Sequence, residues 1–134
     1  MKYLLDTNTC IRFINGRSPA LRAKMLTIND AEIAISTIVQ AEMYAGSAKS
    51  QTPKRSREIQ EEFFRHFVTI PFDTQTARIY GDIRGHLETQ GTPIGGNDLL
   101  IAATALAHDL TLVTHNTREF ARVPGLRLED WEEA

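Results

Sequence analysis

Short apolar runs that alternate with helix-like segments constrain the fold of this 134-residue chain more than any other feature. The apolar runs predict strands, which we expect at residues 3–5, 32–36, 67–72, 110–114 and 126–128. The segments between them have the apolar spacing and the terminal residues of helices, expected at residues 7–14, 18–28, 38–48, 54–66, 74–90, 97–108 and 117–121. Such alternation indicates a parallel sheet with helices on both faces. Functional side chains then gather at the carboxyl ends of the strands.

Asp6 is the first acidic residue at such a position, because it directly follows the apolar run at residues 3–5. A short carboxylate there points into the crevice where the sheet ends. The same residue can instead cap the next helix by accepting a backbone N–H. Thr7 or Asn8 would cap that helix equally well, which slightly weakens the capping explanation for Asp6.

Glu42 lies within a predicted helix, and its neighbours three and four positions away are Ile38, Val39, Ala45 and Gly46. All four are apolar or small, so the Glu42 carboxylate faces inward, where an unpaired charge is costly. It needs a cation, a strong hydrogen-bond donor or a raised pKa. A buried ion pair with an arginine is the alternative.

Asp98 follows a pair of glycines, and Asn116 and Glu119 follow a predicted strand. Asp98 opens the apolar helix at residues 97–108 after two glycines, and a helix N-terminus favours an acid there whatever its function. Asn116 and Glu119 follow the strand at residues 110–114. Their Asn-x-x-Glu spacing resembles a capping box, yet they leave the same sheet edge as Asp6.

Each of Asp6, Glu42 and Asp98 has a structural explanation when taken alone, but the three together are harder to dismiss. Clustered carboxylates repel one another unless they share a cation. A site rich in oxygen and free of cysteine selects hard ions such as Mg²⁺ or Mn²⁺. Such ions activate water and stabilise the charge that develops on a phosphodiester during hydrolysis.

Composition supports one globular domain over residues 1–134. Apolar residues make up 42% of the chain and charged residues 24%, as in a folded rather than a disordered protein. The one cysteine, Cys10, cannot form an internal disulfide, and the apolar start is too short for a signal peptide. The longest apolar stretch, residues 99–107, is about half the length of a membrane span. We therefore expect a soluble cytoplasmic protein without a membrane partner.

The net charge of −2 excludes a bulk polycation that binds nucleic acid indiscriminately. RNA would need a local basic patch, and the densest basic stretch contains Lys49, Lys54, Arg55 and Arg57. A solvated helix start would explain the same charges. The mostly acidic residues 129–133 are expected to form a solvated end.

The order and spacing of these motifs resemble the PIN-domain family, and within it the VapC-type toxins of type II toxin–antitoxin systems. The resemblance covers residues 2–131 and ends in the segment from Gly125-Leu126 to Trp131. The residues that carry it are Leu5-Asp6-Thr7-Asn8, Ala41-Glu42, Gly96-Asn97-Asp98, Ile101-Ala102-Ala103 and Thr114-His115-Asn116 through Phe120. The resemblance implies a three-layer α/β/α sandwich with a central, mostly parallel sheet of four to five strands.

The resemblance also implies that Asp6, Glu42 and Asp98 are the catalytic acids and the ligands of Mg²⁺ or Mn²⁺. The family often has a fourth acid where this chain has Asn116. Either Asn116 or Glu119 is therefore the candidate fourth ligand.

Polar neighbours of these acids are expected to hydrogen-bond to them and hold them in position for the metal. The hydroxyls of Thr7 and Thr114 suit this role, and Asn8 is a further candidate.

The activity implied is that of a metal-dependent endoribonuclease. It would hydrolyse phosphodiester bonds in structured RNA, tRNA in particular, and inhibit translation until an antitoxin neutralises it. The partners implied are a VapB-type antitoxin, the RNA substrate, a second copy of the chain in a homodimer, and a higher toxin–antitoxin complex. The apolar residues Met43, Tyr44, Phe63 and Phe64 favour a dimer surface, although a monomer core can also use them.

Other classes of protein fit less well. A haloacid-dehalogenase-like phosphatase needs a second Asp where this chain has Asn8, and a receiver domain needs a late Lys, whereas no Lys follows Lys54. The chain has no P-loop or Gly-x-Gly-x-x-Gly motif, and its four histidines show no zinc-ligand spacing. The remaining alternative is a catalytically inactive PIN-like module that binds RNA or protein. Retention of all three core acids argues against that alternative.

Overall fold

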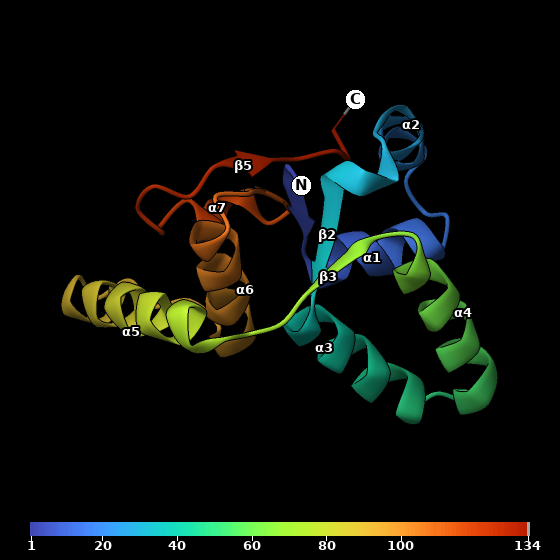
Figure 1. Cartoon of the computed structure of the whole chain (residues 1–134), viewed down its shortest axis with the longest axis horizontal. Helices are drawn as coiled ribbons and strands as arrows, with labels where there is room; N and C mark the ends of the chain where they lie inside the picture. The colour runs from blue at the N-terminus through green and yellow to red at the C-terminus, as the bar shows by residue number, and fades with distance from the viewer. Residues whose placement is uncertain (134) are drawn as a thin grey trace.

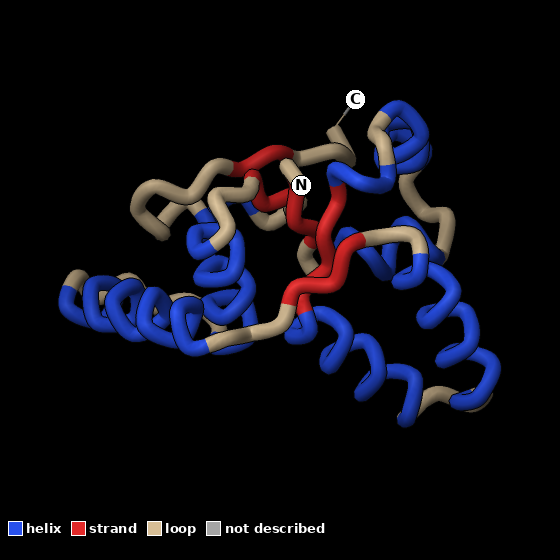
Figure 2. The backbone as a smooth tube through the Cα atoms, viewed as in Figure 1, coloured by secondary structure: helices blue, strands red, loops and turns tan. Residues whose placement is uncertain are grey.

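A five-stranded parallel sheet forms the centre of the computed structural model, which describes residues 1–133. The strands are β1 (Tyr3–Leu5), β2 (Ile33–Ser36), β3 (Val68–Ile70), β4 (Thr111–Val113) and β5 (Leu128–Glu129), in the spatial order β3-β2-β1-β4-β5. The helices are α1 (Thr7–Ile14), α2 (Pro19–Thr27), α3 (Thr37–Ala48), α4 (Pro53–Arg65), α5 (Thr74–Thr89), α6 (Gly96–Ala107) and α7 (Thr117–Phe120), with a 3₁₀ turn, η1 (Asp30–Glu32). Figures 1 and 2 show α5 and α6 on one side of the sheet and α1, α2 and α4 on the other. The prediction of an α/β fold with a central parallel sheet flanked by helices is confirmed.

The three inner strands are buried along their whole length, which explains their continuous apolar sequences. Leu4, Ile35 and Leu112 from β1, β2 and β4 have no exposed surface. The edge strand β3 is different, because its first two residues are exposed. The core therefore surrounds β1, β2 and β4, and it keeps their carboxyl ends in fixed relative positions.

Polar residues that follow the strands start the next helices. The Asp6 carboxylate accepts the backbone N–H of Thr9 after β1, and the Ser36 hydroxyl accepts that of Val39 at the end of β2. Asp73 caps α5 in the same way. As a result, the first turns of α1 and α3 lie at the carboxyl edge of the sheet.

The predicted strand at residues 126–128 begins two residues before the observed β5 and ends one residue before it. The observed β5 pairs Leu128 with Leu112 and Glu129 with Val113. Gly125 has a φ of 77° in the turn that precedes it. The chain leaves this turn at residues 126–127 and enters the sheet only at Leu128.

The residues expected to form a dimer surface pack inside the monomer instead. Met43, Phe63 and Phe64 are 2%, 8% and 6% exposed. Tyr44 is half-buried, with its ring edge-on to Phe64 at 5.6 Å between centroids. The apolar surplus inferred from the sequence is therefore core, and the homodimer stays a prediction without this support. Within residues 1–133, none of the helices combines the length and the apolar character needed to cross a bilayer.

Replacing Leu112 by Ala should destabilise the fold by about 2–5 kcal/mol, because the side chain is fully buried in β4 and its removal leaves a cavity. Leu26→Ala is the matched control, since Leu26 is 74% exposed on α2. Urea unfolding of both variants measures the difference. Equal free energies of unfolding would show that β4 is not part of the cooperative core.

Candidate active site

Asp6 is buried at the carboxyl end of β1, with 5% of its surface exposed. Its Oδ1 accepts the backbone N–H of Thr9 at 2.8 Å, and its Oδ2 accepts the Thr114 hydroxyl at 2.6 Å. Burial raises the pKa of Asp6 above its usual value, although these hydrogen bonds act in the opposite direction. The capping interpretation is confirmed, and it leaves each oxygen with a lone pair for a further ligand.

Glu42 on α3 contacts Thr7 on α1. The Thr7 hydroxyl donates to Glu42 Oε1 at 2.6 Å, joining the first turn of α1 to the second turn of α3. Within residues 1–133, Glu42 forms no ion pair, so the alternative of a buried arginine partner is wrong. Glu42 Oε2 makes no hydrogen bond in the same part of the chain.

Glu119 lies beside Asp98 and is held from two directions. Its Oε1 accepts the backbone N–H of Gly95 at 2.9 Å, and its Oε2 accepts the side-chain amide of Asn116 at 2.7 Å. A Cβ added to Gly95 would lie 3.6 Å from Asp98 Oδ2 and 3.7 Å from Glu119 Oε1, so both carboxylates flank this glycine. Helix α6 begins after Gly95, which places Asp98 in its first turn.

The capping-box interpretation of Asn116 and Glu119 is wrong. The Asn116 side chain makes no capping hydrogen bond to α7, and its backbone N–H donates to the Thr114 hydroxyl. Asn116 orients the Glu119 carboxylate toward Asp98 instead. The spacing of Asn116 and Glu119 suggested a cap because spacing describes only neighbours in sequence. It could not reveal that the backbone N–H of Gly95, 24 residues earlier, binds Glu119.

The four carboxylates share one electrostatic environment. Burial, followed by the negative charges of Glu119, Asp6 and Glu42 in that order of effect, raises the pKa of Asp98 to about 6. None of the four forms an ion pair with a cationic residue in the described chain. The arrangement therefore concentrates negative charge without an internal counter-ion.

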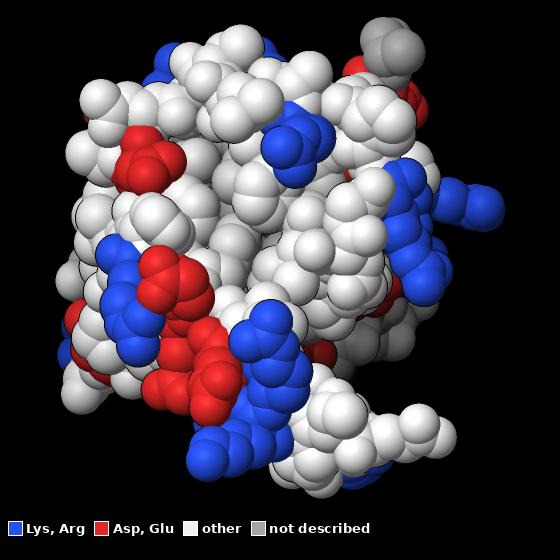
Figure 3. Space-filling view, turned by 90° about the vertical axis from the view of Figure 1, so that its right-hand side faces the viewer, with Lys and Arg blue, Asp and Glu red and all other residues white. Residues whose placement is uncertain are grey.

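The basic stretch expected to bind RNA lies apart from these acids. Lys49 ends α3, and Lys54 and Arg55 are exposed at the start of α4, at the far tip of the α3–α4 hairpin from the sheet (Figure 1). The Arg57 guanidinium covers the Tyr44 ring at 4.9 Å and donates to the Tyr44 carbonyl. Figure 3 shows acidic and basic side chains side by side on the face that α4 occupies. The structure does not bring this stretch to the acidic centre.

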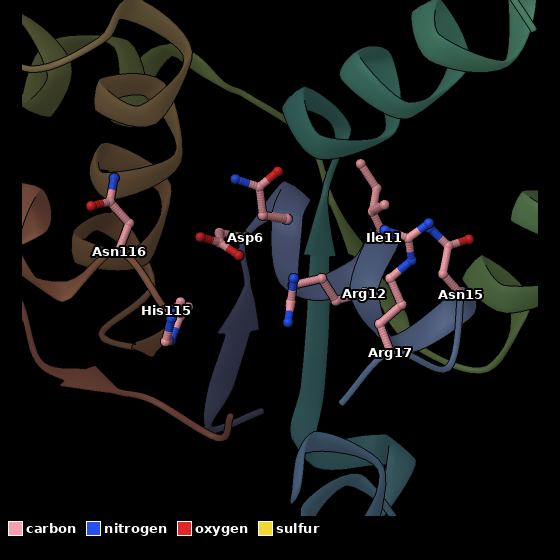
Figure 4. Close-up of a pocket in the computed structure, with 8 residues that line it drawn as sticks. Asp6, Ile11, Arg12, Asn15, Arg17, His115 and Asn116 are labelled. Atoms are coloured by element: carbon pink, nitrogen blue, oxygen red, sulfur yellow. The ribbon is translucent and has the colours of Figure 1, made fainter. Parts of the chain in front are cut away.

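A pocket of about 420 Å³ opens beside Asp6, and the sequence did not reveal it. Figure 4 shows Asp6, His115 and Asn116 on one side and Arg12, Asn15 and Arg17, from α1 and the turn after it, on the other. Asn8 and Ile11 complete the lining. Two arginines spaced along α1 and its C-terminal turn carry no local signal of a site, because an exposed helix normally carries such charges.

Comparison with known proteins identifies the family of this chain. The family model described as PIN domain matches residues 3–126. The chain is 40% identical over 131 residues to the tRNA(fMet)-specific endonuclease VapC of Salmonella typhimurium, covering 98% of both chains. It is 40% identical over 133 residues to ribonuclease VapC2 of Rickettsia felis, covering 98% of this chain and 99% of the relative.

Solved structures give the same result. The chain matches the crystal structure of DNA-bound VapBC from Salmonella typhimurium with a TM-score of 0.92 and 40% identity, covering 98% of both chains. The chain therefore belongs to the PIN-domain family, in the branch of the VapC ribonuclease toxins.

Replacing Asp98 by Asn should stabilise the metal-free protein above pH 6. The pKa of Asp98 is about 6 in the folded protein against an ordinary 3.8, so the folded state binds more protons between these values. The free energy of unfolding must then fall as pH rises through this range, and the variant lacks that fall. Urea unfolding in EDTA over this pH range measures it.

The exposed carboxylate of Asp82 on α5 supplies the control, since Asp82→Asn should leave the pH profile of the parent unchanged. Parallel profiles for the parent and Asp98→Asn would mean that neither burial nor the neighbouring carboxylates raise the pKa of Asp98 in the folded protein.

Proposed function

We propose that this VapC-type endoribonuclease, acting as one nuclease domain, cleaves structured RNA with Mg²⁺ or Mn²⁺ held by Asp6, Glu42 and Asp98. The observation that carries the proposal is the environment of Asp98, whose pKa is raised to about 6 first by burial and then by the negative charges of three other carboxylates. A divalent cation from solution would balance that charge. The buried side of the centre leaves little room for water to do so, since Asp6 is 5% exposed.

The chemistry of the donors fits a hard cation. Asp6, Glu42 and Asp98 offer only carboxylate oxygens, which Mg²⁺ and Mn²⁺ prefer. The one thiol, Cys10, is fully buried, and burial raises its pKa well above the usual value. It therefore stays protonated and supplies no soft ligand.

Hydroxyl groups hold the acids in place for this role. Thr114 fixes Asp6 Oδ2 and Thr7 fixes Glu42 Oε1, which leaves Glu42 Oε2 free to bind. When bound, a divalent cation would supply a Lewis acid for hydrolysis of a phosphodiester bond. Asp98 and Glu119 lie at the open side, where Asn116 and the Gly95 amide keep Glu119 oriented. We infer that Glu119, rather than Asn116, completes the acidic set.

The pocket beside Asp6 is the better candidate for the RNA backbone than the α3–α4 hairpin. Arg17 is exposed there, and Asn8 and Asn15 offer further donors to phosphate oxygens. The relative from Salmonella typhimurium is named for tRNA(fMet). We extend that substrate class, a structured tRNA, to this chain.

A VapB-type antitoxin is the partner that the structural neighbours suggest, because several of them are VapBC complexes. An uncompensated carboxylate cluster also suits the forked guanidinium of an arginine. The alternative of an inactive binding module is not favoured, because the relatives named as ribonucleases align over nearly the whole chain.

Activity on RNA should disappear in EDTA and return with Mg²⁺ or Mn²⁺. Asp6→Asn and Asp98→Asn should each lower the cleavage rate by about two orders of magnitude or more, as when one charge-stabilising group is removed from an active site. Cleavage of total tRNA, followed on denaturing gels, measures both effects. Asp82→Asn is the matched control, and undiminished cleavage in EDTA would exclude the metal mechanism.

Glu119→Gln should weaken Mn²⁺ binding, whereas Asn116→Asp should strengthen it. The first change removes a charge beside Asp98, and the second adds a charge next to Glu119 Oε2, which Asn116 contacts at 2.7 Å. For the same reason, Asn116→Asp should lower the melting temperature in EDTA. Calorimetric titration of Mn²⁺ measures affinity, with the exposed Glu61→Gln as control. Unchanged affinity in both variants would leave a site of three acids.

A further inference from the structure

Residues 129–132 pack against the sheet, contrary to the expectation of a solvated acidic end. Trp131 packs edge-on against Tyr3 at 4.9 Å between ring centroids, and its indole N–H donates to Glu129. The side chains of Asp130 and Glu132 are only 9% and 5% exposed. Glu133, in contrast, is exposed. Two acids of the tail are thus held in fixed positions.

These two acids meet His115 from the loop after β4. Asp130 Oδ2 lies 2.9 Å from His115 Nδ1, and Asp130 Oδ1 accepts the backbone N–H of Glu132 at 2.9 Å. One ligand atom from each of His115, Asp130 and Glu132 lies within 4.8 Å of the others. In the part of the chain that the structure describes, this is the group of three side chains that comes to that spacing.

Glu132 contains a buried oxygen without a partner. The guanidinium of Arg12 bonds Oε1, whereas Oε2 has no hydrogen bond among residues 1–133 and almost no exposed surface. A buried carboxylate oxygen without a donor costs free energy that a hydrogen bond or a cation would recover. This oxygen belongs to the side chain that closes the cluster around His115.

We propose that His115, Asp130 and Glu132 form a second metal site, which takes a borderline divalent ion such as Zn²⁺ and fastens the C-terminal tail to the loop after β4. One imidazole nitrogen and two carboxylate oxygens are a set that Zn²⁺ accepts. Mg²⁺ prefers oxygen alone, so the site differs in selectivity from the acidic centre.

The geometry requires only a small contraction. In a tetrahedral Zn²⁺ site the ligand atoms lie roughly 3.4 Å apart, given bonds of about 2.0–2.2 Å. The present atoms lie within 4.8 Å, so shifts of about 1 Å suffice. His115 is 60% exposed in its side chain, which leaves an open coordination position and an entry path.

Arg12 supports the site rather than blocking it. It bonds Glu132 Oε1 and leaves Oε2 for the ion, and ligating carboxylates commonly have such a hydrogen-bonded partner. The four histidines lack zinc spacing in sequence because the other two ligands lie 15 and 17 residues beyond His115, in a segment brought back by β5 pairing. The proposal does not depend on catalysis at Asp98.

Titration of Zn²⁺ into the full chain labelled with ¹⁵N-histidine, in excess Mg²⁺, tests the site directly. The ring nitrogens of His115 should shift on binding, and those of His86, which is exposed on α5, should not. Zn²⁺ should also raise the melting temperature, because only the folded chain assembles the ligands. The same His115 shift should occur in Asp98→Asn, which separates this site from the acidic centre.

Glu132→Gln should lower the Zn²⁺ affinity by more than about tenfold, since even changes in outer-shell partners have effects of this size. Asp130→Asn is a second variant with the same expected loss. The neighbouring Glu133→Gln should bind like the parent. If Zn²⁺ leaves the His115 signals unchanged, or if both variants keep the parent's affinity, the cluster is a proton-linked ion pair and the proposal is wrong.

Discussion

The parallel pairing of β1 between β2 and β4 determines where the acidic side chains of this protein lie. Leu5 pairs with Val113, so the next residues, Asp6 and Thr114, leave the sheet side by side and form a hydrogen bond of 2.6 Å. Pairing of β1 with β2 starts α3 at the same edge and places Glu42 near Thr7. A one-residue slip in β1 would turn every side chain to the other face and remove Asp6 from the centre.

Placing acidic side chains at the carboxyl edge of the sheet costs stability. Burial of these acids destabilises their charged forms, as the raised pKa values of Asp6 and Asp98 indicate. At Asp98 the negative charges of Glu119, Asp6 and Glu42 add to the effect of burial. Helix N-termini offset part of this cost, because Asp6 precedes α1 and Asp98 lies in the first turn of α6. The hydroxyls of Thr7 and Thr114 offset another part. The negative charge of the carboxylates that these interactions do not compensate would attract a cation. The same charge therefore destabilises the metal-free fold and favours metal binding.

Features of the site that depend on strand order and helix face could be predicted from sequence. Periodicity located the strands, and the small neighbours of Glu42 indicated that it faces inward. Contacts made across the fold could not be predicted. Glu119 was interpreted as a capping-box partner, although it accepts the backbone N–H of Gly95, 24 residues earlier, and the dimer surface expected at Phe63 and Phe64 is core.

The tail shows the same limit. Acidic residues at a chain end normally indicate solvent exposure, whereas Glu132 is bonded by Arg12, 120 residues earlier in the chain. Glu132 is buried because the preceding residue, Trp131, packs on Tyr3 and holds this part of the chain against the sheet. Amphipathic spacing reports which residues face a core, but it does not report which distant residue faces a given side chain.

The loop after β4 connects the two clusters of ligands. Thr114 contacts Asp6, His115 contacts Asp130, and Asn116 contacts Glu119, so three consecutive residues serve alternate sides. The backbone bends at His115, between the Thr114 and Asn116 side chains that contact Asp6 and Glu119. An ion at His115 would restrain this backbone without touching the acids. Its effect on the centre would therefore be one of positioning, passed through the Thr114 hydroxyl and the Asn116 amide.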